Sequence, residues 1–174
     1  ETGAQRLAQL RGALRGAGLD GFIVPRADLH QGETVAPADE RLRWLTGFTG
    51  SAGLCVVLPG VAGVFVDGRY RVQVRGQVDL AAFTPVNWPE VKPGDWLAEH
   101  LTAGGRVGFD PWLMTGREVD EAQGRLAGTG IELVACENMV DRIWADRPAP
   151  PCGTARVHPL DLAGEASAAK RARL

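Results

Sequence analysis

The sequence predicts an α/β domain with a mixed β-sheet flanked by helices. Short apolar segments typical of strands alternate along the chain with segments in which apolar residues recur at helical spacing. Two neighbouring strands are separated only by residues 59–61, which predicts a hairpin and therefore an antiparallel pair in the sheet. The length of 174 residues is sufficient for one domain with a hydrophobic core.

The first predicted element is a helix that ends at Gly18, a residue suited to the left-handed position after a helix. Its signals are leucines at helical spacing and a capping box. These residues are Thr2, Gln5, Leu7, Leu10 and Leu14. We expect a buried strand at 21–25 and then a polar loop at 26–38. A short helix at 39–45, ending at Gly47, follows that loop.

The following elements continue the alternation. The hairpin strands are expected at 54–58 and 62–66, and further strands at 81–86, 106–109 and 131–135. Helices are expected after Asp67-Gly68 and at the ranges 95–101, 115–126 and 139–144. Thr115 and Glu118 form a second capping box, which predicts where the third of these helices begins.

Prolines and a glycine between residues 148 and 153 interrupt regular structure. We therefore expect an N-terminal domain at 1–147, a proline-rich linker at 148–157 and the start of a second, truncated domain at 158–174. A helix is expected at 164–174. The chain lacks an initial methionine and stops inside this helical pattern, so we expect it to be a piece of a longer protein.

Composition excludes several classes of protein. With 45% hydrophobic residues, 23% charged residues and a net charge of −2, it gives no electrostatic reason to expect a nucleic acid or an anionic membrane as a partner. No apolar run approaches the roughly 20 residues that span a bilayer, and no signal peptide is recognisable. Cys55, Cys136 and Cys152 lie far apart, which favours reduced thiols in a cytoplasmic protein over a zinc site or a disulfide framework.

The glycines at 47, 50 and 53 could suggest a phosphate-binding loop. A strand follows them, so no helix N-terminus is available to hold an anion. Ser51 does not fit a nucleophile elbow either, because Thr49 occupies the first glycine position of that motif. We interpret these glycines as structural residues of a tight connection.

Asp28, His30 and Glu33 could be metal ligands on one loop. A tight site requires a further ligand and a second shell, and the other histidines lie in unrelated segments. Loop hydrogen bonding is the better interpretation, and we assign no metal ligand and no catalytic residue to this chain.

Asp67-Gly68-Arg69-Tyr70 follows a predicted strand and begins a helix. An arginine at such a turn can bind a carboxylate or a carbonyl through its planar fork. On sequence physics alone, a structural ion pair of Arg69 with Asp67 or another acid is the better interpretation.

Taken together, the motifs resemble the N-terminal domain of the Xaa-Pro aminopeptidase (aminopeptidase P) family, of the three-domain cytosolic type. The matching segments occur in order and cover nearly the whole chain. They are residues 23–31, 44–53, 66–70, 107–111, 138–148 and 158–174. The sequence departs from the family at 32–34, where Gly-Glu-Thr replaces Ser-Glu-Tyr, so the resemblance assigns no role to the tip of that loop.

The resemblance implies a three-layer, ribonuclease H-like accessory domain that shapes substrate access. The parent enzyme would be a cytoplasmic homodimer that releases the N-terminal residue from short peptides with proline in second position. Two divalent metal ions, usually manganese, would lie in a catalytic domain outside this chain. The resemblance also implies that Arg69 contacts substrate, in preference to the structural ion pair.

Two alternatives to the peptidase function remain open. One is a creatinase-like enzyme that acts on a small amide. The other is a non-catalytic, peptidase-like module that binds proteins, although the sequence has no charge run of the kind that such modules use.

Overall fold

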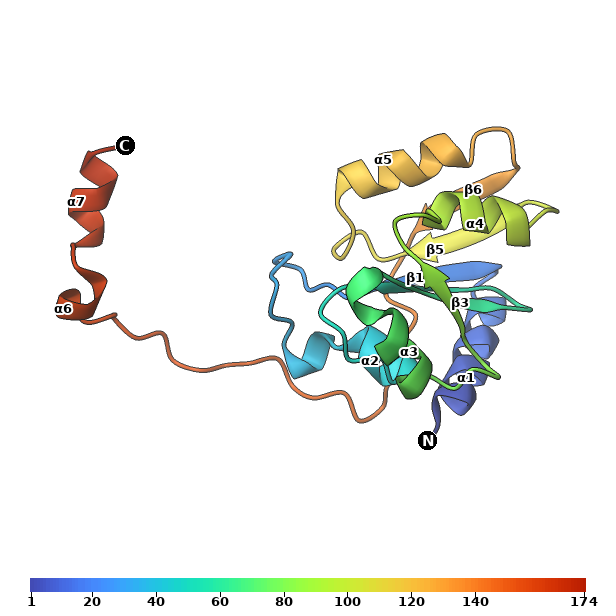
Figure 1. Cartoon of the computed structure of the whole chain (residues 1–174), viewed down its shortest axis with the longest axis horizontal. Coiled ribbons are helices and arrows are strands. Elements are labelled where there is room, and N and C mark those ends of the chain that lie inside the picture. Colours follow the sequence, from blue (N-terminus) through green and yellow to red (C-terminus); the bar gives the residue numbers. More distant parts are fainter.

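The computed structural model describes residues 1–174 and contains a six-stranded mixed sheet with helices on both faces (Figure 1). The strands lie in the order β4-β3-β2-β1-β5-β6. Their bounds are β1 Gly21–Pro25, β2 Leu54–Val57, β3 Ala62–Val66, β4 Thr84–Asn87, β5 Gly105–Phe109 and β6 Ile131–Ala135. Only β2 runs antiparallel to its neighbours, because the tight turn after it forms the predicted hairpin with β3. The predicted fold class is confirmed.

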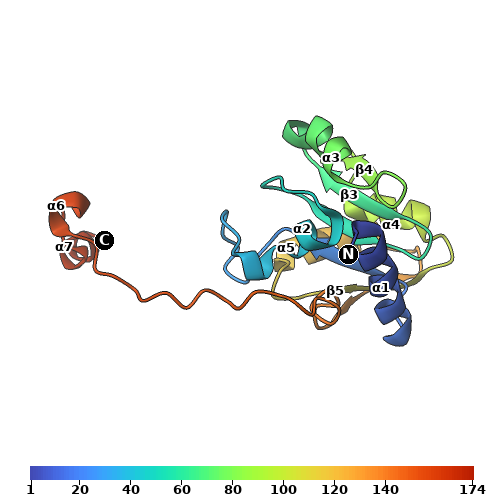
Figure 2. The ribbon, with the colours of Figure 1, turned by 90° about the horizontal axis from the view of Figure 1, so that it is seen from below.

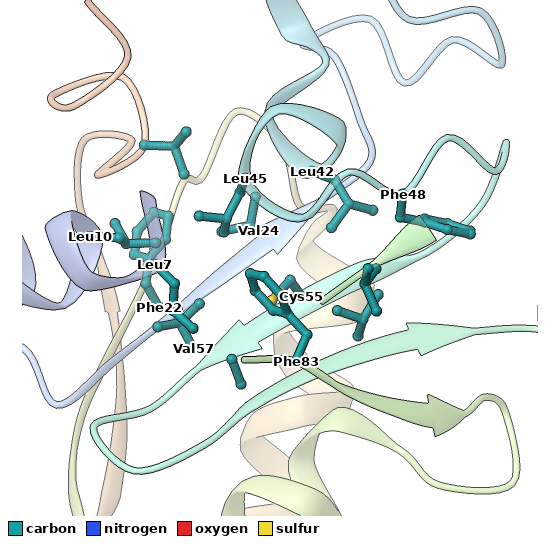
Figure 3. Packing of buried hydrophobic residues seen from close by; sticks show 14 of the residues in the cluster. Leu7, Leu10, Phe22, Val24, Leu42, Leu45, Phe48, Cys55, Val57 and Phe83 are labelled. Atoms are coloured by element: carbon teal, nitrogen blue, oxygen red, sulfur yellow. The ribbon is translucent and has the colours of Figure 1, made fainter. Parts of the chain in front are cut away.

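Helices cover the two faces of the sheet as separate layers. The helices α1 (Gly3–Gly16), α2 (Arg41–Thr46) and α3 (Arg71–Gln77) lie below the sheet in Figure 1, and α4 (Pro93–His100) and α5 (Gly116–Arg125) lie above it. Successive strand residues point to opposite faces. Phe22 and Val24 therefore join the core under α1 and α2, whereas Ile23 joins the core under α4 and α5. Figure 3 shows the first of these cores.

The two predicted capping boxes and the left-handed glycine after the first helix are confirmed. Thr2 Oγ1 accepts a hydrogen bond from the backbone N–H of Gln5 at 3.3 Å, and the Gln5 side chain accepts one in return from the backbone N–H of Thr2. Thr115 and Glu118 form the same reciprocal box. After α1 the chain takes a left-handed conformation at Gly18, where φ is +66°. These local signals suffice because a cap depends only on residues within one turn of it.

Two predicted elements within residues 1–147 differ in the structure. Residues 139–144 form turns in place of a helix, and most of their hydrogen bonds join residues two or three apart, as from Asp141 N–H to the Asn138 carbonyl. The strand predicted at 81–86 begins only at Thr84, because residues 79–83 first form a turn around the Asp79 carbonyl.

Residues 148–159 have no regular structure and are exposed. The helix predicted at 164–174 is present but shorter, because Gly164 has a φ of +75° and ends a separate short helix, α6 (Leu160–Ala163). The helix α7 (Ser167–Ala172) follows, and neither of the two contains a buried residue. This segment extends away from the sheet in both views (Figures 1 and 2). None of the helices combines the length and apolar character needed to cross a membrane.

Candidate functional site

The sequence motifs meet at one edge of the sheet, here called the carboxyl edge. Five of the six strands run in the same direction and end there, and β2 begins there because it runs the opposite way. The loops at this edge are 26–36, 47–53, 67–70, 88–92 and 110–114. Open α/β sheets bind ligands at this edge, because loops that follow neighbouring strands lie side by side.

Arg69 lies in the 3₁₀ turn η2 (Gly68–Tyr70), directly after β3. Asp67 caps this turn by accepting the backbone N–H of Arg69 at 2.9 Å. The same carboxylate accepts from the guanidinium, with Nε to Oδ1 at 3.1 Å and Nη2 to Oδ2 at 2.8 Å. The Asp67 hydrogen bond raises the pKa of Arg69, and the pKa of Asp67 is lowered by the hydrogen bond from the Arg69 side chain. The ion pair expected from sequence physics is therefore present.

The ion pair leaves part of the Arg69 guanidinium open. A guanidinium has five N–H groups in a planar fork, and the Nε and one Nη2 hydrogen are directed at Asp67. The Arg69 side chain is 64% exposed, whereas that of Asp67 is only 18% exposed. Asp67 thus holds one side of the fork in a fixed orientation, and the other side faces solvent at the carboxyl edge.

The Tyr70 ring also helps to hold the Arg69 guanidinium in this orientation. The Arg69 guanidinium carbon lies 5.0 Å from the centre of the Tyr70 ring, within the range of a cation–π contact. The ring in turn meets buried Phe48 edge-on at 5.6 Å between centroids. The Tyr70 hydroxyl and Ser51 Oγ are hydrogen-bonded at 2.6 Å, and this bond lowers the pKa of Tyr70. The turn at Arg69 is therefore joined to the loop at 47–53.

The glycines of that loop are structural, as predicted. A Cβ at Gly50 would lie 2.2 Å from the Phe48 ring, and one at Gly53 would lie 2.8 Å from the Phe65 carbonyl oxygen. Gly53 also has a φ of +157°, which other residues rarely adopt. A strand follows the loop, as expected, so no helix N-terminus is aligned with it.

Arg26 joins the loops at 26–36 and 47–53. Its Nη1 donates to the carbonyl oxygens of Ser51 at 2.9 Å and Glu33 at 3.1 Å. The carboxylate of Glu33 makes a small further contribution to the raised pKa of Arg69. Sequence analysis did not single out Arg26, and the only available signal was its position directly after the end of β1.

The candidate metal ligands form loop hydrogen bonds. Asp28 Oδ1 accepts the backbone N–H groups of His30 at 2.9 Å and Gly32 at 3.0 Å, and these backbone hydrogen bonds lower its pKa. No three His, Cys, Asp or Glu side chains lie close enough together to hold a metal ion.

The fold and these side chains place the chain in the class of α/β domains that present fixed polar side chains at the ends of parallel strands. The comparison with known families then identifies it further. The chain belongs to the creatinase/prolidase N-terminal domain family, whose model matches residues 6–143.

Relatives and solved structures agree with this assignment. The probable Xaa-Pro aminopeptidase P of Arthroderma otae is 39% identical over 171 residues, which cover 92% of this chain and 26% of that protein. The crystal structure of the X-prolyl aminopeptidase of Caenorhabditis elegans, a cytosolic enzyme with a di-nuclear active site, matches with a TM-score of 0.78 and 32% identity. This match covers 86% of the chain and 26% of that enzyme.

A further match is the N-terminal domain of the cytoplasmic peptidase PepQ from Mycobacterium tuberculosis, with a TM-score of 0.63 and 28% identity. It covers 80% of this chain and 98% of that domain. The chain spans about a quarter of the length of the curated relatives it matches.

Proposed function

We propose that the chain is the N-terminal accessory domain of a metallo-aminopeptidase that releases the residue preceding an N-terminal proline. The proposal rests on the family assignment and on the relatives named Xaa-Pro aminopeptidase P. The domain shapes access to the active site of its parent for short peptides. Its residues 1–147 form this accessory domain, 148–157 form a linker and 158–174 begin a second domain.

In this proposal, Arg69 binds a carbonyl or carboxylate oxygen of the peptide. The observation that supports it most directly is the half-open guanidinium. One side of the fork is held by Asp67, and the other side is exposed at the edge of the sheet where ligands of α/β domains bind. A planar fork already held in place loses little freedom on binding, so its hydrogen bonds can contribute to affinity.

In this proposal the parent's metals belong to a separate catalytic domain; in support, no group of three or more His, Cys, Asp or Glu side chains in this chain could hold a metal ion. Two divalent ions, proposed to be manganese, would supply the Lewis-acid chemistry there. The parent is proposed to be a cytoplasmic homodimer. Support for the location and for two metals comes from the C. elegans enzyme, described as cytosolic with a di-nuclear active site.

The direct test is the hydrolysis of Xaa-Pro peptides by the full-length parent and its Arg69 variants. Arg69→Ala should lower kcat/KM by roughly 10- to 100-fold, since one charge-assisted contact to the substrate is lost. Arg69→Lys should restore little of it, because an ammonium does not reproduce the fork. Arg75→Ala, which removes an exposed arginine from α3, is the matched control and should leave kcat/KM unchanged.

Other outcomes would contradict parts of the proposal. If Arg69→Ala unfolds the domain while activity per folded molecule stays normal, Arg69 is only a structural ion-pair residue. If the parent hydrolyses a small amide and no peptide, the creatinase-like alternative is correct. If the parent hydrolyses neither peptides nor small amides with manganese added, the chain belongs to a binding module. Chelator-sensitive cleavage by residues 1–174 alone would show that the catalytic centre lies in this chain.

A further inference from the structure

A cavity of about 130 Å³ lies between α4 and α5, on the face of the sheet opposite α1. It is reached from the carboxyl edge, because it is lined by residues at the ends of β1 and β4, at the start of β2 and at the beginnings of both helices. Its apolar lining consists of Ile23, Pro25, Leu54, Trp88, Pro93, Met114 and Ala122. Nothing in the proposed function uses this cavity.

The size and lining of the cavity suit one apolar group. Apolar cavities of roughly 150 Å³ in proteins remain dry and bind molecules such as benzene. Ile23 is 2% exposed and Ala122 is 9% exposed, so both belong to the domain core and form the buried, apolar base of the cavity. A phenyl ring or a branched aliphatic side chain therefore matches this cavity in both volume and polarity.

Three of the four charged side chains that line the cavity are paired with other charges. Arg125 contacts Asp95 at 2.7 Å and Glu121 at 3.6 Å. Lys92 Nζ lies 3.5 Å from the same Glu121 carboxylate. The fourth, Glu118, accepts from Thr115 through Oε2 in the capping box and has no cationic partner. The apolar side chains of the lining cannot solvate an ion, so the cavity favours a group without charge.

Further apolar side chains are exposed at the same edge. Trp112, two residues before Met114, is 73% exposed, and Leu29 in the loop after β1 is 55% exposed. A ligand no larger than the cavity would leave these side chains in water. A peptide that places one side chain in the cavity can also cover its surroundings, which favours a peptide as the occupant.

We propose that the cavity between α4 and α5 is a subsite for an uncharged aromatic or branched aliphatic side chain of a peptide. That the peptide is a substrate of the parent rests on the proposed function. The binding itself is a property of this chain and does not require catalysis.

Binding can be measured on the 174-residue chain by NMR titration with N-acetyl-L-phenylalaninamide. We expect saturable shifts of the Met114 and Ala122 amides and of the Trp88 indole, with a dissociation constant on the order of 1 mM for a ligand of this size. N-acetylglycinamide lacks the side chain and N-acetyl-L-lysinamide carries a charge, so neither should give saturable shifts at the same positions.

Ala122→Leu is the blocking variant, since its extra carbons occupy the cavity. It should weaken binding at least roughly tenfold while leaving the melting temperature unchanged or raised, the signature of a filled cavity. Ala127→Leu makes the same change at an exposed position just after α5 and should bind as the unmodified chain does. The subsite is disproved if the phenylalanine compound gives no saturable shifts, or if folded Ala122→Leu binds it normally.

The link to the substrate is tested separately in the full-length parent. Ala122→Leu should raise KM for Xaa-Pro peptides with an apolar residue after the proline, and leave KM unchanged when glycine follows. If Ala122→Leu changes KM equally for both peptides, or for neither, the peptide bound in the cavity is not the substrate. A parent that hydrolyses no Xaa-Pro peptide would refute the proposed function. The titration of the 174-residue chain would still show whether the cavity binds an apolar side chain.

Discussion

A buried charge network joins the beginning of α2 to the last turns of the domain, and removing one carboxylate from it should destabilise the fold. Arg41, with only 6% of its side chain exposed, donates to both carboxylate oxygens of Asp141 at 2.7 and 3.0 Å. It also pairs with Asp39 at 3.0 Å. Burial alone would lower the pKa of Arg41, but the bonds to Asp141 and Asp39 raise it above its ordinary value.

The loss of stability in Asp141→Ala depends on how well the remaining buried charge of Arg41 is compensated. Removing one partner of a buried ion pair costs about 3–5 kcal/mol, because the other charge stays buried without compensation. Asp39 remains, and the Asp141 side chain is 29% exposed, so water can replace part of the loss. We therefore expect about 2–4 kcal/mol of lost stability. For a domain of this length, that corresponds to a fall in melting temperature of roughly 6–12 °C.

Urea unfolding followed by circular dichroism would measure this loss as a lower midpoint with an unchanged m-value. Arg41→Met should cost less, because Arg147 still pairs with both carboxylates. Glu137→Ala removes an exposed ion pair with Arg142 and serves as the control, with no measurable shift expected. Normal stability of Asp141→Ala, or an equal loss in the control, would refute this account of the network.

Three further results are expected. In Arg69→Ala, NMR titration should show the pKa of Asp67 rising towards its ordinary 3.8, because the hydrogen bond that lowers it is lost. Because the pKa of Asp67 is lowered in the folded protein, its carboxylate stabilises the fold above pH 3.8, and this stabilisation is lost as the pH falls through the folded pKa. The Arg69→Ala variant should not show this pH-dependent loss of stability. Exposed Cys152 should react at once with a thiol reagent, whereas buried Cys55, whose pKa burial raises, should react only on unfolding; similar rates would contradict its burial. Residues 164–174 should show no protection from amide exchange, because their helix has no buried residue, and strong protection in dilute monomer would be the opposite result.

Elements with local signals were predicted correctly. Both capping boxes, the left-handed Gly18 and the hairpin between β2 and β3 depend on residues close together in the chain. The α/β class also follows from local periodicity, because strands and helices alternate along the sequence. One helix predicted from periodicity is absent. Residues 139–144 have helical spacing, but Asp141 is held by Arg41, a hundred residues earlier, and the segment forms turns.

For the candidate site, the sequence by itself determined the residue types and their order: a glycine loop before a strand, and an arginine one residue after a turn glycine. From these alone it supported the Asp67–Arg69 ion pair, since the two residues are neighbours. Only the tertiary structure decided that Tyr70 and Ser51 meet, and that Arg26 joins two loops. The cavity between α4 and α5 was equally unpredictable. The physical reason is that the order and direction of strands not joined by a tight turn, which no local pattern encodes, place loops from distant parts of the chain at one edge.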